Sequence, residues 1–423
     1  MQIHIKTYGC TLNHADSDIV EGVARAAGMR ISGEMDADVI VVNTCTVKAV
    51  TERKILERLA GYEAQGRSVV VTGCMASANP DLIERYAPHA SIVTTPNAHM
   101  IPELALDVAG GNKLAVDGYS KRDAAALANP CHGVIARIPI SDGCLSACSF
   151  CETKRARGPL NSFPERSILK AVSIAAGNGA REIELASQDT GAYGLDRGTN
   201  IAELMKRISC IEGDFMVRVG MLNPEHMCRY MDGFIDAFED RRFYRFAHLP
   251  VQSGSDRVLR EMRRNYTVND VKTMFEKLRE RVDGITIETD VIVGYPGETR
   301  DELSETLKFL ESSRPDITNI SKFAARPHAS ASSLKQFTNE EVKVRSAETS
   351  RRVRALQHSI NEGFLGRNVD VLITEKGALS ANGKTRSYRQ VVINRGHESI
   401  KLGTWQRVKI DKVSANALYG APA

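Results

Sequence analysis

Short apolar runs alternate with amphipathic stretches in the first quarter of the chain. The runs QIHIKTYG, DVIVVNT and SVVVTG are typical of strands. Apolar positions with helical spacing follow them over residues 15–27, 48–65 and 79–87. Strands that alternate with helices form a parallel sheet with helices packed on it. The pattern therefore predicts an N-terminal α/β domain over residues 1–112.

The same alternation continues further along the chain. A Gly-, Ala- and Asp-rich segment, residues 113–130, is predicted to be a linker. Residues 131–362 are predicted to form a second α/β domain, with strand-like runs at 134–140, 182–187, 215–220, 245–250, 285–293 and 317–324. In residues 363–423 the short alternating runs VDVLIT, YRQVVI and WQRVKIDKV, separated by glycines, predict a small all-β barrel.

Composition narrows the class of protein. The chain has 423 residues, 42% of them apolar and 26% charged, which excludes a disordered, collagen-like or coiled-coil protein and suggests two or three domains. No apolar run approaches the roughly 20 residues that span a bilayer. The start, MQIHIKTYGC, lacks the features of a signal peptide. We expect a cytoplasmic protein with no membrane partner.

Positive charge is concentrated at the C-terminus. Residues 363–423 contain ten Lys or Arg against four Asp or Glu, a net charge of +6, although the whole chain carries only +4. Such a segment suits a polyanion such as RNA. A basic surface facing solvent explains the charge equally well. The candidate RNA-binding residues are Lys384, Arg386, Arg389, Lys401, Arg407 and Lys409.

Nine cysteines are present, and without a secretory signal they favour metal binding over disulfides. Cys10, Cys45 and Cys74 each follow one of the first three strand-like runs. The carboxyl ends of parallel strands meet at one edge of a sheet, so we expect these thiols to share a site. The neighbouring Gly9 and Gly73 suit tight turns and close backbone approach.

A second, compact group has the spacing CxxxCxxC: Cys144, Cys148 and Cys151. Three thiolates from one loop suit a four-iron, four-sulfur cluster with one iron left open, and the spread group could hold a second such cluster. Structural zinc normally takes four ligands, and the Cys131-His132 pair could complete a zinc site, so zinc remains an alternative. The other two cysteines, Cys210 and Cys228, are predicted to be core residues on helices.

Longer motifs strengthen the first interpretation. CxxxCxxC with Phe150 before its last cysteine is typical of radical S-adenosylmethionine enzymes. The segments TYGCTLNHADSD, VNTCTVK, TGCM, HLPVQSGSDRVLREMRRNYT and TDVIVGYPGET occur in the order found in methylthiotransferases. The chain resembles that family over essentially its full length. QDTGAYG, RVGMLNP and VLITEKG are similar to its archaeal and eukaryotic branch. His328, in RPHAS, departs from the Arg-Pro-Gly-Thr of many relatives.

This resemblance implies an N-terminal parallel-sheet domain, a central partial (βα)6 radical S-adenosylmethionine barrel and a C-terminal RNA-binding TRAM domain. It also implies two [4Fe-4S] clusters, on the two cysteine groups, and S-adenosylmethionine. The implied reaction converts N6-threonylcarbamoyladenosine at tRNA position 37 to its 2-methylthio derivative. The residues expected to contact S-adenosylmethionine are Phe150, Gln188, Asp189, Gln252 and Ser253, each of which could instead serve as a capping or turn residue. Arg155 and Arg157 are expected to meet phosphate or carboxylate of the substrate, and Asp290 is a further candidate.

The expected partners are tRNA, a one-electron donor protein and a source of sulfur. Within the same chemistry, isopentenyladenosine in tRNA and an aspartate of a ribosomal protein are alternative substrates. Outside it, an iron–sulfur RNA-binding protein that senses redox state would explain the cysteines and the basic C-terminus, although not the barrel motifs. A zinc-stabilised binding module is the third hypothesis. The sequence leaves the oligomeric state open.

Overall fold

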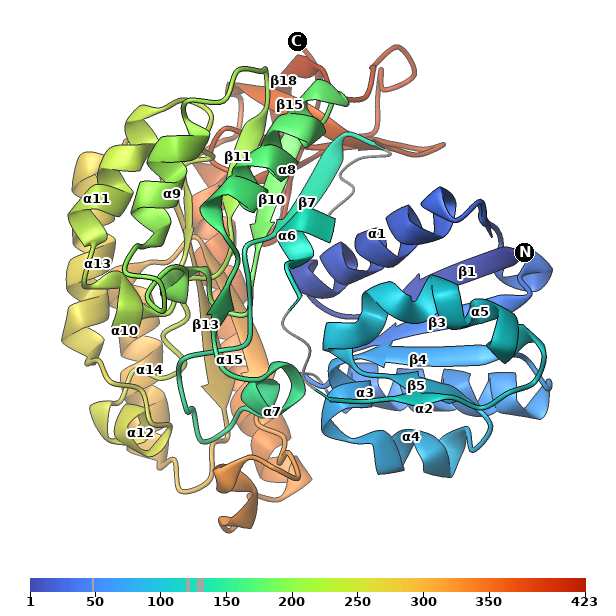
Figure 1. Cartoon of the computed structure of the whole chain (residues 1–423). Helices are drawn as coiled ribbons and strands as arrows, with labels where there is room; N and C mark the ends of the chain where they lie inside the picture. Colours follow the sequence, from blue (N-terminus) through green and yellow to red (C-terminus); the bar gives the residue numbers. More distant parts are fainter. Residues whose placement is uncertain (48, 119–121, 128–132) are drawn as a thin grey trace.

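The computed structural model describes residues 1–47, 49–118, 122–127 and 133–423. Its N-terminal part is a parallel sheet, as the patterning predicts (Figure 1). The strand order is β2-β1-β3-β4-β5-β6. The predicted strands are β1, β3 and β4, and the short strands β2, β5 and β6 extend the edges. Their bounds are β1 Gln2–Thr7, β2 Arg30–Ile31, β3 Val39–Thr44, β4 Val69–Gly73, β5 Ser91–Val93 and β6 Ala115–Val116.

Helices cover both faces of this sheet. Along β3, Val39 and Val41 pack with α1 and α5, while Ile40 and Val42 pack with α2 and α4. Successive side chains of a strand point to opposite faces, which is why an uninterrupted apolar run is needed here. The helices are α1 Thr11–Ala26, α2 Ala49–Ala64, α3 Cys74–Ala78, α4 Pro80–Tyr86 and α5 Ile101–Ala109.

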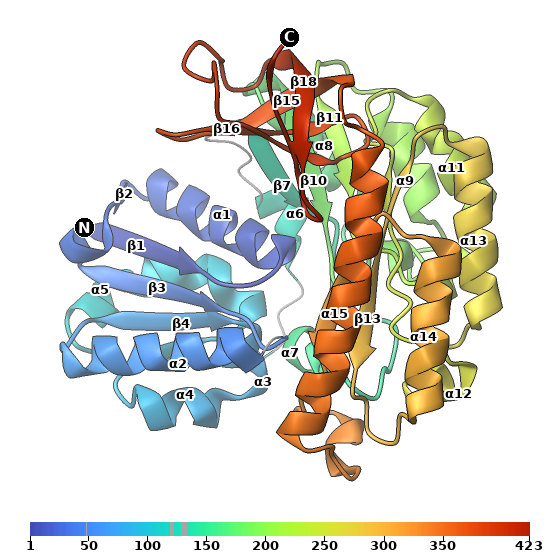
Figure 2. The ribbon, with the colours of Figure 1, turned by 180° about the vertical axis from the view of Figure 1, so that it is seen from behind.

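The central domain is an open barrel of six parallel strands. The trios β11-β10-β7 and β12-β13-β14 are joined where Val217 pairs with Phe243 and Leu222 N donates to His248 O. All six predicted strands are present: β7 Ile135–Pro139, β10 Glu182–Ala186, β11 Met216–Val219, β12 Phe246–His248, β13 Thr286–Val293 and β14 Ile317–Lys322. The outer layer includes α8 Glu165–Gly177, α9 Ile201–Ile208, α11 Met231–Asp236, α13 Val268–Arg281, α14 Arg300–Ser313 and α15 Asn339–Glu362 (Figure 2).

Strand β13 shows how the two faces of this barrel differ. Ile287 and Val291 are fully buried in the main core, against the outer helices, and Val293 packs with residues of α14. The alternate residues Glu288 and Asp290 lie on the other face and remain partly exposed. The barrel is therefore apolar toward its helices and charged toward its inside.

The C-terminal residues form a closed five-stranded barrel, as predicted. Its strands are β15 Asn368–Lys376, β16 Ala381–Thr385, β17 Gln390–Ile393, β18 Trp405–Val413 and β19 Leu418–Pro422, of which β16 and β19 were not expected from the pattern. This barrel rests on the amino ends of the central strands (Figure 1). There Tyr388 packs 4.8 Å, centroid to centroid, from both Tyr244 and Phe246.

The segment predicted as a linker carries short elements where it is described. β6 belongs to the N-terminal sheet, and α6 (Ala124–Leu127) packs against α8 of the central domain. Arg122, between them, is buried. The segment thus joins two domains and contributes to both. Within the described ranges, no helix combines the length and the apolar character required to cross a membrane.

Candidate active site

Cys10, Cys45 and Cys74 follow β1, β3 and β4 and lie together at the carboxyl edge of the N-terminal sheet. The thiols of Cys10 and Cys74 both donate to Asn13 Oδ1, each at 3.7 Å. Gly73 has a φ of +91°, and a Cβ there would lie 2.5 Å from the Thr44 nitrogen. Only glycine, which has no Cβ, fits where the backbones of residues 73 and 44 come this close. The predicted shared site is therefore present, and Asn13 joins two of its thiols.

Cys144, Cys148 and Cys151 lie in the loop between β8 (Ser141–Asp142) and α7 (Thr153–Arg157). The loop is held by Ser149 N, which donates to Met262 O, and by Arg264, whose Nη1 lies 3.4 Å from Cys148 Sγ. Burial raises the pKa of the Cys144 thiol to about 12. Cation binding would have to displace its proton.

The two cysteine groups are neighbours in space. Glu152, directly after Cys151, accepts a hydrogen bond from Thr46, directly after Cys45. Arg157, at the end of α7, donates from Nε to Cys74 Sγ at 3.4 Å. Helix α7 thus connects the barrel loop to the edge of the N-terminal sheet (Figure 1).

The spacing of the thiols separates a cluster from a single ion. Two sulfurs bound to one zinc ion lie at most about 4.6 Å apart, because Zn–S bonds are about 2.3 Å long. Among the described residues, the only group of three or more metal-binding side chains with ligand atoms all within 4.8 Å is His248, Glu288 and Asp290. Neither cysteine group is therefore that compact. The wider spacing suits an iron–sulfur cluster, whose ligands bind different irons.

Unsatisfied polar atoms mark the carboxyl end of β10. Gln188 Oε1 and Asp189 Oδ2 are buried without a hydrogen-bond partner, and His226 Nε2 lies 3.5 Å from that Asp189 oxygen. His226 in turn lies 3.2 Å from the hydroxyl of Ser146, inside the CxxxCxxC loop. Burial raises the pKa of Asp189, a shift that His226 opposes. Buried acceptors without partners are rare and suit a ligand that donates, such as an ammonium group.

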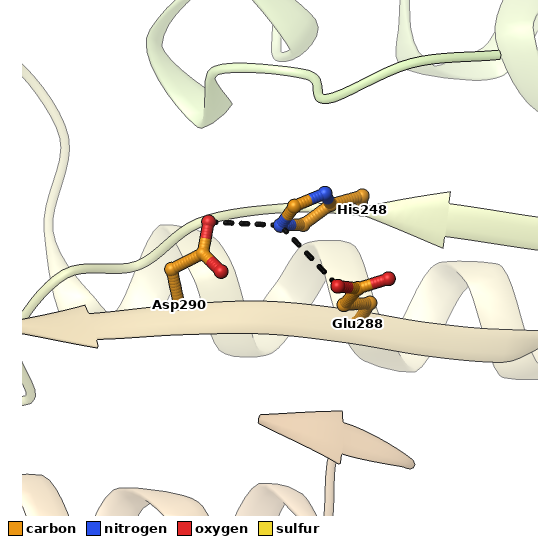
Figure 3. A group of neighbouring side chains, drawn as sticks. All are labelled: His248, Glu288 and Asp290. Atoms are coloured by element: carbon orange, nitrogen blue, oxygen red, sulfur yellow. Dashed lines mark hydrogen bonds and ion pairs between the residues drawn. The ribbon is translucent and has the colours of Figure 1, made fainter. Parts of the chain in front are cut away.

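A charged group lies on the inner face of the barrel. Figure 3 shows His248 of β12 beside Glu288 and Asp290 of β13, with His248 Nε2 2.8 Å from Asp290 Oδ2 and 4.0 Å from Glu288 Oε1. Asn319 of β14 donates to both carboxylates, at 2.6 and 2.8 Å. Sequence reasoning singled out only Asp290, because its partners become neighbours only through strand pairing.

Comparisons with known proteins agree with this arrangement. Residues 2–95 match the uncharacterized protein family UPF0004, and residues 138–310 match the radical SAM superfamily. A protein of Archaeoglobus fulgidus named "Probable threonylcarbamoyladenosine tRNA methylthiotransferase" is 37% identical over 425 residues, covering 99% of this chain and 98% of its own. The "Threonylcarbamoyladenosine tRNA methylthiotransferase" of Xenopus laevis is 33% identical, covering 100% of this chain and 77% of its own. The chain belongs to the threonylcarbamoyladenosine tRNA methylthiotransferase family.

Solved structures agree on the fold of this methylthiotransferase. The radical S-adenosylmethionine methyltransferase TsrM from Kitasatospora setae superposes with a TM-score of 0.57 over 78% of this chain and 77% of its own, at 13% sequence identity. The radical enzyme OxsB superposes with a TM-score of 0.53 over 83% of this chain and 56% of its own, at 12% identity. At such identities the likeness concerns the fold alone.

Among the residues predicted to contact S-adenosylmethionine, Ser253 requires correction. It is fully buried, and its Oγ accepts from Ser255 N and contacts Thr306 of α14, so it holds the turn after β12. Gln252 is partly exposed and has a φ of +71°, a strained backbone conformation that is often kept at functional sites. Phe150 is half-buried and packs against the apolar cluster that contains Tyr295.

The two arginines after the cysteine loop of the methylthiotransferase differ from the prediction. Arg155 is exposed and donates to Ala78 O at 3.3 Å. Arg157 is 2% exposed, and its guanidinium pairs with Asp16 Oδ2 at 2.6 Å and Asp142 Oδ1 at 3.2 Å. The prediction that Arg157 meets substrate is wrong, because protein acids already surround it.

Two of the predicted RNA-binding residues are structural instead. Lys384 pairs with Glu182 of β10, and Arg389 is buried against Asp316 and Asn361. Both fix the C-terminal barrel on the central domain, because a buried charge needs a partner. The remaining four candidates, Arg386, Lys401, Arg407 and Lys409, are exposed.

The remaining sequence predictions concern three cysteines and two histidines. Cys210 and Cys228 are exposed at helix ends, so the prediction that they are core residues is wrong. Cys131 and His132 lie outside the described residues. His328 is exposed, two residues after a buried Arg326 that pairs with Glu52 of the N-terminal domain at 2.7 Å.

Proposed function

We propose that this enzyme converts N6-threonylcarbamoyladenosine at position 37 of tRNA to its 2-methylthio derivative. The observation that carries the proposal is the pair of neighbouring cysteine groups, joined by Thr46–Glu152 and Cys74–Arg157. Inserting sulfur at an adenine carbon needs one centre that makes a radical and another that holds sulfur. Two such centres side by side in one chain meet both needs.

We assign one [4Fe-4S] cluster to Cys144, Cys148 and Cys151 and a second to Cys10, Cys45 and Cys74. When bound, the first cluster and S-adenosylmethionine would supply the radical that removes hydrogen from C2 of the adenine, the second cluster would supply the sulfur, and a second molecule of S-adenosylmethionine would supply the methyl group. The protein's part is to hold these groups in place and to exclude water.

Several side chains serve that purpose in the proposal. The unsatisfied oxygens of Gln188 and Asp189 accept from the amino group of S-adenosylmethionine. Arg264 and Arg157 each place a guanidinium 3.4 Å from one cysteine sulfur, Cys148 and Cys74 respectively. Hydrogen bonds to cluster sulfurs set reduction potential, so these two arginines tune the two centres separately.

We assign the C-terminal barrel to RNA binding, as a TRAM domain. Replacing Arg386, Lys401 and Lys409 together with glutamine is expected to weaken tRNA binding and to flatten its salt dependence. Each lost phosphate contact lowers the slope of log K against log salt by about 0.7–0.9. Filter binding of tRNA between 50 and 200 mM salt measures this slope. Since these side chains are exposed, iron content should not change, and an unaltered slope would contradict the role.

We place the reaction in the cytoplasm, with a one-electron donor protein and a separate source of sulfur. The test of the function is anaerobic turnover with reductant, S-adenosylmethionine and tRNA carrying threonylcarbamoyladenosine, followed by mass spectrometry of the nucleosides. The expected product is that nucleoside with an added methylthio group. Parallel reactions with isopentenyladenosine tRNA and with ribosomal protein test the two other substrates. Formation of 5′-deoxyadenosine with no methylthio product from any substrate would overturn the proposal.

A further inference from the structure

A row of polar side chains crosses the inner face of the central barrel from β10 to β14. Strand register places Glu184 beside Arg218, His248 beside Glu288, and Asp290 beside Asn319. Arg218, His248, Glu288 and Asp290 are partly exposed, Asn319 is exposed and Glu184 is buried, so the apolar core does not enclose most of them. We call this set the inner row: Glu184, Arg218, His248, Glu288, Asp290 and Asn319.

The negative charges of Glu288 and Asp290 in the inner row are compensated by neighbouring side chains of the protein. His248 hydrogen-bonds Asp290 and lies 4.0 Å from Glu288 (Figure 3). Asn319 donates to both carboxylates. Burial alone would lower the pKa of His248, but Asp290 and Glu288 together raise it above its usual value. The imidazole therefore carries positive charge more readily than a free histidine, which offsets the acids.

Arg218 differs from every other member of the row. Its guanidinium lies over the rings of Phe246 and Tyr388, at 5.4 and 5.5 Å, and its Nε is buried without a hydrogen-bond partner. No hydrogen bond or ion pair joins this guanidinium to another side chain in the described ranges, although, against the effect of burial, the charges of Glu184, Glu288 and Glu182 act on it and raise its pKa. By contrast, the neighbouring Arg137 of β7 pairs with Asp18 at 3.3 Å and Glu184 at 3.4 Å. A guanidinium held flat by two rings, with donors left over, suits a bidentate carboxylate.

The depth of Arg218 fits the length of the substrate. It lies three residues before Met221, whose carbonyl accepts from Thr190 N at the strand ends, beside the site of Gln188 and Asp189. At about 3.3 Å per residue, Arg218 is about 10 Å further into the barrel. An adenine whose C2 faces the strand ends can direct its N6 substituent inward. The threonylcarbamoyl group ends in a carboxylate at that depth.

We propose, building on the function proposed above, that Arg218 binds the carboxylate of the threonylcarbamoyl group. The rest of the inner row borders the urea and hydroxyl of the same group. This arrangement also rejects an isopentenyl group. Such an apolar chain would remove water from charged side chains without replacing the hydrogen bonds, and sites of this kind discriminate strongly.

The experiment compares the natural nucleoside in tRNA with an analogue in which a neutral amide replaces the threonyl carboxylate. The wild-type enzyme is expected to have a kcat/KM about 10- to 100-fold lower for the amide, because a charge-assisted bidentate contact is lost. R218M should have a reduced kcat/KM for the carboxylate and near-equal values for the two substrates. R218K keeps the positive charge but lacks the paired N–H donors of the guanidinium. Its preference for the carboxylate should therefore lie between those of the wild type and R218M.

Two further measurements separate the possible results. R207M, an exposed arginine on α9, is the matched control and should discriminate like the wild type. Iron content and thermal melting test whether R218M is folded. If R218M is not folded, the result rests on R218K alone, which should prefer the carboxylate substrate less strongly than the wild type does. A folded Arg218 variant that still prefers the carboxylate tenfold or more overturns the inference. A wild type that modifies neither substrate overturns the proposed function instead.

Discussion

Cys74→Ala is expected to abolish methylthiolation while leaving cleavage of S-adenosylmethionine intact, whereas Cys144→Ala is expected to abolish both. The two cysteines belong to neighbouring but separate groups, so each substitution removes a ligand from one proposed cluster only. Loss of one of three thiolates leaves too few ligands to hold a cluster. Product should fall below detection in both variants, and 5′-deoxyadenosine should disappear only in Cys144→Ala. Anaerobic turnover followed by mass spectrometry measures both compounds.

Iron analysis adds a readout that does not depend on turnover. Each variant should lose about half of the iron and sulfide of the wild type. Cys210→Ala and Cys228→Ala are the controls, because both thiols are exposed and lie outside the two groups. They should keep full iron content and full activity. Substantial methylthiolation by Cys74→Ala, or loss of iron in the controls, would contradict the assignment.

The positions of the six cysteines could be predicted because chain order dictates them. A cysteine that ends a strand of a parallel sheet must lie at the carboxyl edge, so Cys10, Cys45 and Cys74 needed only the strand pattern. The roles of basic residues could not be predicted in this way. Lys384 and Arg157 carry the positive charge expected of an RNA-binding residue. Their acidic partners, however, come from distant segments of the chain.

Register explains the remaining differences. The inner row joins residues of five strands, and sequence patterning does not give the pairing of one strand with the next. Cys228 was misassigned for a related reason. Its helix, α10 (Pro224–Met227), ends before it and is too short for apolar spacing to indicate which side is buried. Local patterns therefore locate elements and strand ends, while partners across the barrel require the fold.

Arg157→Met is expected to destabilise the protein more than any other single arginine substitution considered above. Arg157 pairs with Asp16 of α1 and Asp142 of β8 and donates to Asn13 Oδ1 at 3.0 Å, so it binds the N-terminal domain to the barrel. Removing one partner from a buried ion-pair network costs about 3–5 kcal/mol, because charges are left uncompensated. Arg122 still contacts both acids, so we expect the lower end of this range.

Arg155→Met is the matched control, since it removes an exposed arginine from the same helix. Urea unfolding should show about 3 kcal/mol less stability for Arg157→Met than for this control. A difference below about 1 kcal/mol would contradict a structural role for the network. In the folded protein, a redox titration should also show a lower reduction potential for the centre at Cys74, because the Nε hydrogen bond to its sulfur is gone.

The same substitution should change how stability depends on pH. Burial alone would raise the pKa of Asp142, but Arg122 and Arg157 hold it below the usual value of 3.8. A carboxyl with a lowered pKa stabilises the folded state above its unfolded pKa, and this contribution is lost as pH falls through the folded pKa. In wild type the loss should therefore begin below about pH 4. In Arg157→Met only Arg122 remains to lower the pKa of Asp142, so burial raises that pKa relative to the wild type. The loss of stability should therefore begin at higher pH. Unfolding curves between pH 3 and 7 test this shift, and identical pH profiles for Arg157→Met and Arg155→Met would show that Arg157 does not stabilise the Asp142 charge.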